Sequence, residues 1–178
     1  MINKKDFDQL YDELLVKFYT EMINRKPSTK YSVIYPCVGK KFKETGLMIC
    51  GQAINGYDKA YSWKISGIKT SDQREKIIQE NKEYSKNEWP LVDMEEFSKK
   101  KPFFRITKRI LVDHYKINEK KYQSYFTWTN LMKIGRTNGG NPDDSEFYAQ
   151  IDICKQIFKY ELDYLQPKNV ILFSGKIT

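Results

Sequence analysis

Two short apolar runs constrain the fold of this chain more than any other feature of its sequence. Leu47-Met48-Ile49-Cys50 lies between two glycines, and Val170-Ile171-Leu172-Phe173 follows Pro167 closely. Continuous apolar runs of this length are typical of strands that are buried on both faces of a parallel sheet. A third run, Ser124–Thr129, is rich in aromatic residues and predicts another strand.

Helical patterns separate these strands. We expect helices over residues 4–24, 70–87, 102–115 and 143–165, with the apolar stripe of the third formed by Phe103, Ile106, Ile110 and Leu111. Thr70 with Gln73, and Asp143 with Glu146, have capping-box spacing at two helix starts. The alternation predicts an α/β fold, a three-layer α/β/α sandwich with a short, mostly parallel central sheet.

The organisation of the chain predicts a single domain over residues 1–178. Residues 1–45 are expected to form an N-terminal helix followed by a surface loop, because residues 25–45 are basic and contain two prolines. Three cysteines without a C-x-x-C pair argue against a disulfide framework and a metal cluster, so we expect no metal and no cofactor. Unpaired thiols suit a reducing compartment, which predicts a cytoplasmic protein.

The formal net charge of +8 favours a polyanionic partner, since clustered cations release phosphate counterions when they bind nucleic acid. The sequence contains no signal-peptide pattern and no apolar run of membrane-spanning length, so no membrane partner is expected. We therefore expect DNA as the partner of a monomeric protein. The bland alternative is that the lysines serve only solubility.

Motifs follow the first two predicted strands, and a turn pattern precedes the last one. The first strand leads into Gly51-Gln52-Ala53-Ile54-Asn55-Gly56, and the second ends in Thr129-Asn130, followed by Lys133 and Gly139-Gly140-Asn141-Pro142. Glu161-Leu162 and Pro167-Lys168 then precede the last strand, which ends near Gly175. In this order and spacing, residues 45–178 resemble the uracil-DNA glycosylase superfamily, whose third motif, H-P-S, is not present. The resemblance implies either that the C-terminal part of the fold is missing from this chain or that this branch has lost the motif.

The resemblance also implies roles for individual residues. Asn130 would bind the edge of a flipped base, since its amide can donate one hydrogen bond and accept another. Backbone groups of the glycine loop would contact the same base, and the residues concerned are Gly51, Ala53, Asn55 and Gly56. Candidate base-stacking residues are Tyr57, Tyr61 and Trp63, and Lys133 and Arg136 would bind phosphate.

The departures from the family pattern concern the chemistry. Gln52 stands where one branch has a glutamate, and it is the candidate catalytic residue because it can orient a water molecule. The lone histidine, His114, lies in a predicted helix before the second motif. The functional hypothesis is a glycosylase-like protein that binds or removes uracil or a related damaged base in DNA. The alternatives are an inactive nucleic-acid-binding relative, or an α/β protein that binds a nucleotide or another small molecule.

Overall fold

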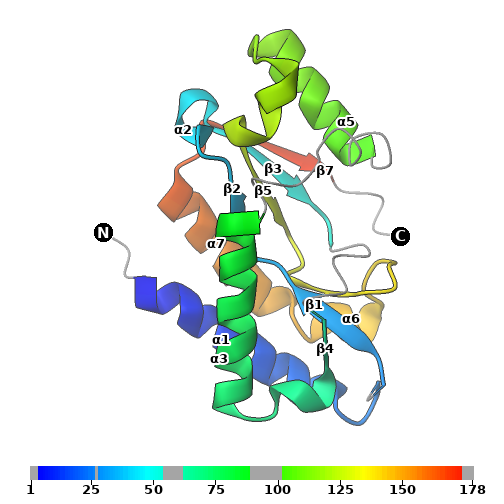
Figure 1. The fold of residues 1–178 in the computed structure, drawn as a ribbon. Coiled ribbons are helices and arrows are strands. Elements are labelled where there is room, and N and C mark those ends of the chain that lie inside the picture. Colours follow the sequence, from blue (N-terminus) through cyan, green and yellow to red (C-terminus); the bar gives the residue numbers. More distant parts are fainter. Residues whose placement is uncertain (1–3, 27, 54–61, 89–101, 174–178) are drawn as a thin grey trace. The chain divides into compact units, whose positions relative to one another are not determined.

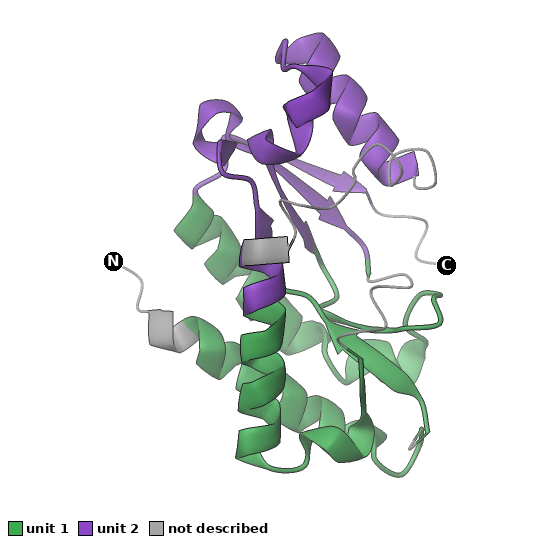
Figure 2. Cartoon of the chain, in the orientation of Figure 1, with its two compact units in different colours: residues 1–35, 53–82, 130–165 green, residues 36–52, 83–129, 166–178 purple. Residues whose placement is uncertain are grey.

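The computed structural model describes residues 4–26, 28–53, 62–88 and 102–173 (Figure 1). Its contacts divide the chain into two compact units, each assembled from three segments (Figure 2). Unit 1 comprises residues 1–35, 53–82 and 130–165, and unit 2 comprises residues 36–52, 83–129 and 166–178. Neither unit is continuous in sequence, so the prediction of one domain over 1–178 stays a prediction.

Unit 1 is built around a three-stranded antiparallel sheet. The strand order is β4 (Trp63–Lys64), β1 (Lys30–Val33) and β6 (Ile134–Arg136). Its helices are α1 (Lys4–Met22), the 3₁₀ turn η2 (Ile65–Ile68), α3 (Ser71–Glu83), α6 (Asp144–Tyr148) and α7 (Ile151–Leu165). The central strand β1 thus pairs with β6, about 100 residues later in the chain, and no local sequence pattern predicts this pairing.

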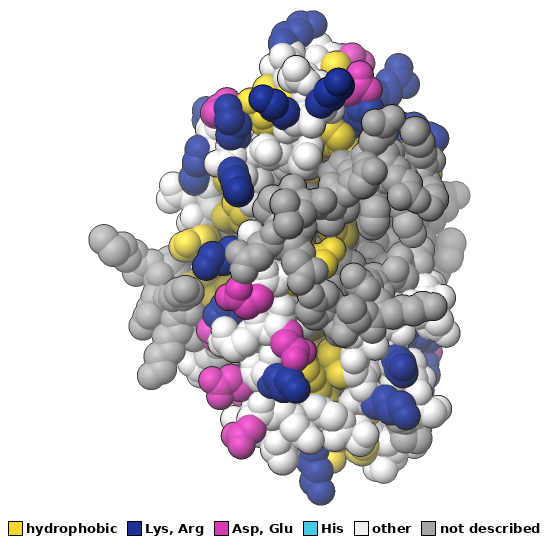
Figure 3. Space-filling model, viewed as in Figure 1, with side chains coloured by type: hydrophobic (Ala, Val, Ile, Leu, Met, Phe, Trp, Pro, Cys, Tyr) yellow, Lys and Arg dark blue, Asp and Glu magenta, His cyan; other side chains and the backbone are white. Residues whose placement is uncertain are grey.

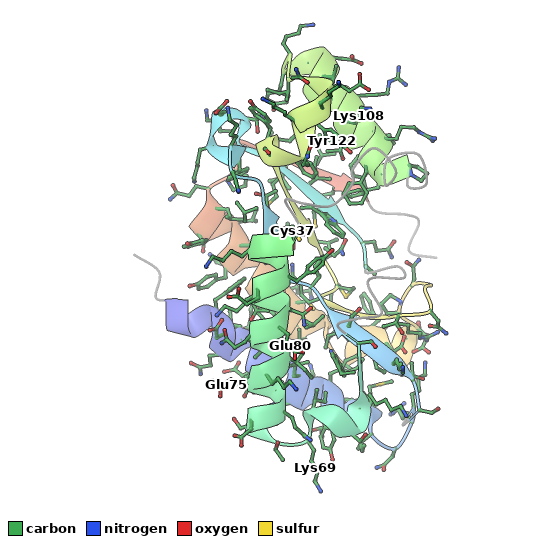
Figure 4. The ribbon with its side chains drawn as sticks, in the orientation of Figure 1. Cys37, Lys69, Glu75, Glu80, Lys108 and Tyr122 are labelled. Atoms are coloured by element: carbon green, nitrogen blue, oxygen red, sulfur yellow. The ribbon has the colours of Figure 1, made fainter. Side chains whose placement is uncertain are left out.

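The core of unit 1 forms because α1 and α7 each carry an apolar stripe. The stripe of α1 supplies Tyr11, Leu14, Leu15, Phe18 and Met22, all of them fully buried. The Tyr11 hydroxyl donates a 2.8 Å hydrogen bond to the carbonyl of Ile34, and this bond satisfies a polar group inside the core. On the outer side of α3, Glu75 and Glu80 extend into solvent (Figure 4).

Unit 2 contains a four-stranded sheet in the order β2-β5-β3-β7. The strands are β2 (Cys37–Val38), β3 (Leu47–Gly51), β5 (Phe126–Asn130) and β7 (Asn169–Phe173). β3 pairs in parallel with β7, whereas β2 runs antiparallel to β5. The helical elements are α2 (Phe42–Thr45), α5 (Pro102–Arg109), the π-helical turns η3 (Tyr84–Glu88) and η5 (Ile110–His114), and the 3₁₀ segment η6 (Glu119–Tyr125).

The strand order of this sheet reverses at β3. The chain leaves β3, forms β5 on one side of it, and later forms β7 on the other side. In open α/β sheets, ligands bind near such a reversal, outside the carboxyl ends of the strands. The end of β3 and the neighbouring end of β5 are therefore the positions at which to look for a site.

Several local predictions are confirmed. The predicted helix over 4–24 is α1, the apolar run at 47–50 is β3, and both capping boxes form. The helix predicted over 102–115 is present as α5 and η5, but its buried side chains are Phe104, Thr107 and Leu111, and Ile106 is 42% exposed. The apolar stripe was therefore placed about one residue out of register.

Other predictions are wrong. Residues 25–45 do not form a surface loop, because β1, β2 and α2 lie there and Tyr31, Val33 and Ile34 are fully buried. β7 is not a buried strand: it stands at the edge of its sheet, with Leu172 53% exposed. The α/β class is confirmed, but the described strands form two sheets, one of them antiparallel, instead of one mostly parallel sheet. The three-layer arrangement stays a prediction.

Among the described helices, none combines the length and apolar character that crossing a membrane requires.

Candidate base-recognition site

Asn130, the last residue of β5, is the strongest candidate for a recognition group. Every residue of β5 is buried, and only 2% of Asn130 is exposed. Its amide nitrogen Nδ2 is buried and has no hydrogen-bond partner among the described residues, as is also true of Trp63 Nε1 and the hydroxyls of Ser32 and Thr127. An unsatisfied buried donor costs about 1–3 kcal/mol, and such groups are rare enough in native proteins to call for an explanation. A ligand acceptor that reaches Nδ2 would remove this cost.

The segment that follows β5 is held by polar bonds within unit 1. The carbonyl of Lys133 accepts a 2.9 Å hydrogen bond from the amide of Ile34. The amide of Lys133 donates to the Cys154 thiol at 3.4 Å. The side chain of Gln150 binds both backbone groups of Ile134, accepting from its amide at 2.9 Å and donating to its carbonyl at 3.0 Å. These bonds tie the segment to the residue after β1 and to the N-terminal part of α7 with the residue before it, so the chain leaving Asn130 has a defined path.

Lys133 itself is locked in a buried ion pair. Its ammonium group lies 2.7 and 2.8 Å from the two carboxylate oxygens of Glu161, and both side chains are 0% exposed. The Nζ atom also lies 5.9 Å from the ring centroid of Phe158. A lysine with this burial cannot reach a phosphate outside the protein, so the structure gives Lys133 a different role from the phosphate contact that the resemblance implies.

Arg136 lies in a charge network with two carboxylates. Its Nε atom donates to Glu146 at 2.7 Å, and its guanidinium also lies 2.7 Å from Asp143. Lys26 pairs with the same two carboxylates, and the Tyr31 hydroxyl donates to Glu146 at 2.8 Å. Two cations and two anions therefore balance, which leaves Arg136 little net attraction for a phosphate.

The network shifts the titration of its members. Burial favours the neutral carboxyl of Asp143 and Glu146, but the hydrogen bonds from Lys26 to Asp143 and from Arg136 to Glu146 outweigh it. The pKa of each carboxyl is therefore held below its usual range. Burial, followed by the hydrogen bond to Glu146, raises the pKa of Tyr31 far above its usual value. The carboxylates are thus charged across the neutral range, and the phenol stays protonated.

The glycine loop is described only at its start. Gly51 ends β3 and is buried, while Gln52 and Ala53 are half-buried. β3 and β5 are hydrogen-bonded neighbours, so the two strands that lead into the predicted site residues stand side by side. Asn55, Gly56, Tyr57 and Tyr61 lie outside the described residues. The prediction that 51–57 and 130–136 lie together stays a prediction.

Trp63, the remaining candidate for base stacking, belongs to the core of unit 1. Only 6% of it is exposed, and its ring centroid lies 5.6 Å from that of Tyr31 and 6.2 Å from that of Phe18. Its ring is taken up by these contacts, and the structure assigns it to packing.

Sequence reasoning gave Glu161, Glu146 and Gln150 no role at the site, although their side chains hold the segment after Asn130. One signal could have found Glu161, since it falls on the buried stripe of α7 together with Cys154, Ile157 and Leu165. A charged residue on an apolar stripe is rarely buried unless it is paired, so a glutamate at such a position indicates a partner of opposite charge. The signal does not say which of the chain's lysines and arginines is that partner.

Other chemistry finds little support in the described part of the chain. No group of three or more His, Cys, Asp or Glu side chains there is arranged to hold a metal ion. All three cysteines are buried and none is in a disulfide, and burial raises the pKa of the Cys154 thiol to about 12. A thiol with that pKa is not a nucleophile at neutral pH. Comparisons with family models, curated proteins and solved structures find no match.

Proposed function

We propose that this chain is a DNA glycosylase-like protein that recognises uracil or a related base through Asn130. The observation that carries the proposal is the buried, unpartnered Nδ2 donor at the end of β5, beside the strand that leads into the glycine loop. The amide offers one donor and one acceptor group, and a uracil edge presents the complementary O4 acceptor and N3–H donor. The resemblance of residues 45–178 to the glycosylase superfamily gives Asn130 the same role.

The chain has less support for catalysis than for base recognition. Gln52 replaces an acid in the glycine loop and cannot act as a carboxylate base. His114, the single histidine, is exposed at the end of the π-helical turn η5 in unit 2. We therefore propose base recognition with little or no excision. DNA is the proposed partner, and a monomeric, cytoplasmic protein stays a prediction.

The test replaces only the donor. Asn130→Asp keeps the size of the side chain but exchanges the NH₂ group for a second oxygen, and Asn138→Asp is the matched control at an exposed turn position. Fluorescence anisotropy would compare single-stranded oligonucleotides with one central uracil or one central cytosine, which presents an amino donor and a ring-nitrogen acceptor in place of O4 and N3–H. We expect the wild-type preference for uracil to fall about tenfold in Asn130→Asp, which corresponds to one hydrogen bond of about 1.4 kcal/mol.

The outcomes separate the candidate functions. An unchanged preference in Asn130→Asp, or no preference in the wild type, would reject base recognition by this residue. Binding of free nucleotides without binding of oligonucleotides would support the small-molecule alternative instead. The Asn138→Asp control should behave as the wild type, because that side chain is exposed in the turn after β6.

A further inference from the structure

The positive charge of this protein is concentrated in one of its two units. The three segments of unit 2 contain 15 Lys and Arg residues against eight Asp and Glu residues, a formal charge of +7. The longer unit 1 contains 16 against 15, a formal charge of +1. Lysines that served solubility alone would be mixed with acids over both units, and unit 2 departs from that pattern.

In unit 1 several of the described cations lie in contact with acids. Besides the pairs of Lys133 and Arg136, Arg74 binds Asp12 at 2.6 Å and Lys82 binds Asp8 at 2.7 Å. Lys17 is 3.2 Å from Asp152. These pairs consume the charge locally, so unit 1 presents little net field to a partner.

In unit 2 more than half of the excess, +4 of +7, lies on the continuous segment from α5 to η6. Between Arg105 and Lys121 the sequence has six Lys and Arg residues but only two acids, Asp113 and Glu119. Glu119 pairs with Lys108, and this pair lowers the pKa of Glu119 through the hydrogen bond and the charge of Lys108. One of the two acids is thereby neutralised, and within the described ranges the other basic side chains of the segment have no carboxylate in contact.

The unpaired cations of this segment are exposed. We define the basic face of unit 2 as the side chains of Arg105, Arg109, Lys116, Lys120 and Lys121, all of them exposed. Arg105 and Arg109 stand four residues apart on α5 and therefore share one side of the helix. Figure 3 shows Lys and Arg side chains gathered over α5, η6 and α2, and Figure 4 labels Lys108 on α5 and Tyr122 in η6.

We propose that the basic face of unit 2 docks the phosphate backbone of DNA. Guanidinium groups fit phosphate oxygens through paired hydrogen bonds, and lysines add point charges around them. The phosphate contacts thus come from this face instead of from Lys133 and Arg136, whose charges are already satisfied. The choice of DNA rests on the proposed function, but the docking chemistry needs no base recognition and no contribution from Asn130.

The magnitude follows from counterion release. Each phosphate neutralised on duplex DNA adds about −0.9 to the slope of log affinity against log salt concentration. Five contacts therefore give a slope of about −4.5, and removal of two contacts makes it shallower by about 1.8.

The experiment compares two charge reversals of equal size. Arg105→Glu with Arg109→Glu changes the basic face, and Lys155→Glu with Lys159→Glu changes two exposed lysines, also four residues apart, on α7 of unit 1. Fluorescence anisotropy with labelled duplex DNA at about 50 to 200 mM salt gives the affinity and the slope of log affinity against log salt concentration. Circular dichroism checks that each variant is folded. If the glutamates unfold the protein, Arg105→Gln with Arg109→Gln makes the same comparison.

We expect the α5 variant to lose at least about tenfold in affinity with a shallower slope, and the α7 variant to lose far less. Equal losses in both variants, no DNA binding at low salt, or tighter binding to anionic lipid vesicles than to DNA would overturn the proposal. The result is independent of the Asn130 test: loss of base preference with unchanged salt slope concerns Asn130, and loss of slope with unchanged preference concerns the basic face.

Discussion

The buried pair of Lys133 and Glu161 provides the sharpest test of the structure. Removing one partner leaves the other charge buried and uncompensated, which typically costs about 3–5 kcal/mol. Lys133→Met and Glu161→Leu should each show that loss, because both side chains are 0% exposed and nearly equidistant hydrogen bonds of 2.7 and 2.8 Å join them. For a chain of this length the midpoint of thermal unfolding should fall by about 6–20 °C.

The double variant decides the mechanism. Lys133→Met combined with Glu161→Leu removes both charges and leaves apolar side chains of similar length in their place. Its stability should return to within about 1 kcal/mol of the wild type or exceed it, because desolvation of the pair is then no longer required. The two single losses would sum to about 6–10 kcal/mol, so the coupling between the sites should be large.

The control is a pair on the surface of the same helix. Lys159 and Asp163 are also 2.7 Å apart, but their side chains are 75% and 50% exposed. Lys159→Met should change stability by no more than about 0.5 kcal/mol. Thermal unfolding, followed by the helix signal in circular dichroism at about 222 nm, measures the stability of all four variants. Single losses below about 1 kcal/mol, or a double variant as unstable as the sum of the singles, would refute the buried pair.

Three further predictions concern other parts of the molecule. Because the pKa values of Asp143 and Glu146 are lowered in the folded state, the stability they add is present above about pH 4 and lost as pH falls further. Urea unfolding at a series of pH values should show this loss. Glu146→Gln should lower the stability at neutral pH and make its dependence on acid pH flatter. Gly39→Ala should destabilise the protein by about 2–3 kcal/mol, since the added Cβ would lie 2.4 Å from the carbonyl oxygen of Ser124. The control is Gly67→Ala, whose Cβ would meet nothing within 4 Å. Its free energy of unfolding should stay within about 0.5 kcal/mol of the wild type in the same assay. Excision of uracil from an oligonucleotide should be slight, and robust cleavage on a denaturing gel by protein at sub-stoichiometric amounts would contradict the assignment of Gln52 to the position of an acid.

Local patterns in the sequence were sufficient for the elements whose stability is local. The stripe of α1, the capping boxes at Thr70 and Asp143, and the apolar run of β3 depend on residues within a few positions of each other, and all were predicted. The same is true of the position of Asn130 at a strand end, because strand and turn residues are neighbours in sequence.

Tertiary structure decided the features that join distant residues. The strand Lys30–Val33 is part of a sheet only because Ile134–Arg136 and Trp63–Lys64 pair with it. The basic, proline-containing sequence around it predicted a surface loop, although its side chains are mostly buried. The pairing of Lys133 with Glu161, 28 residues away, converts a predicted phosphate contact into a buried ion pair. The partition of charge between the units depends likewise on which segments pack together. A sequence shows that a lysine carries a charge, but the packing of remote segments decides whether that charge meets a carboxylate or solvent.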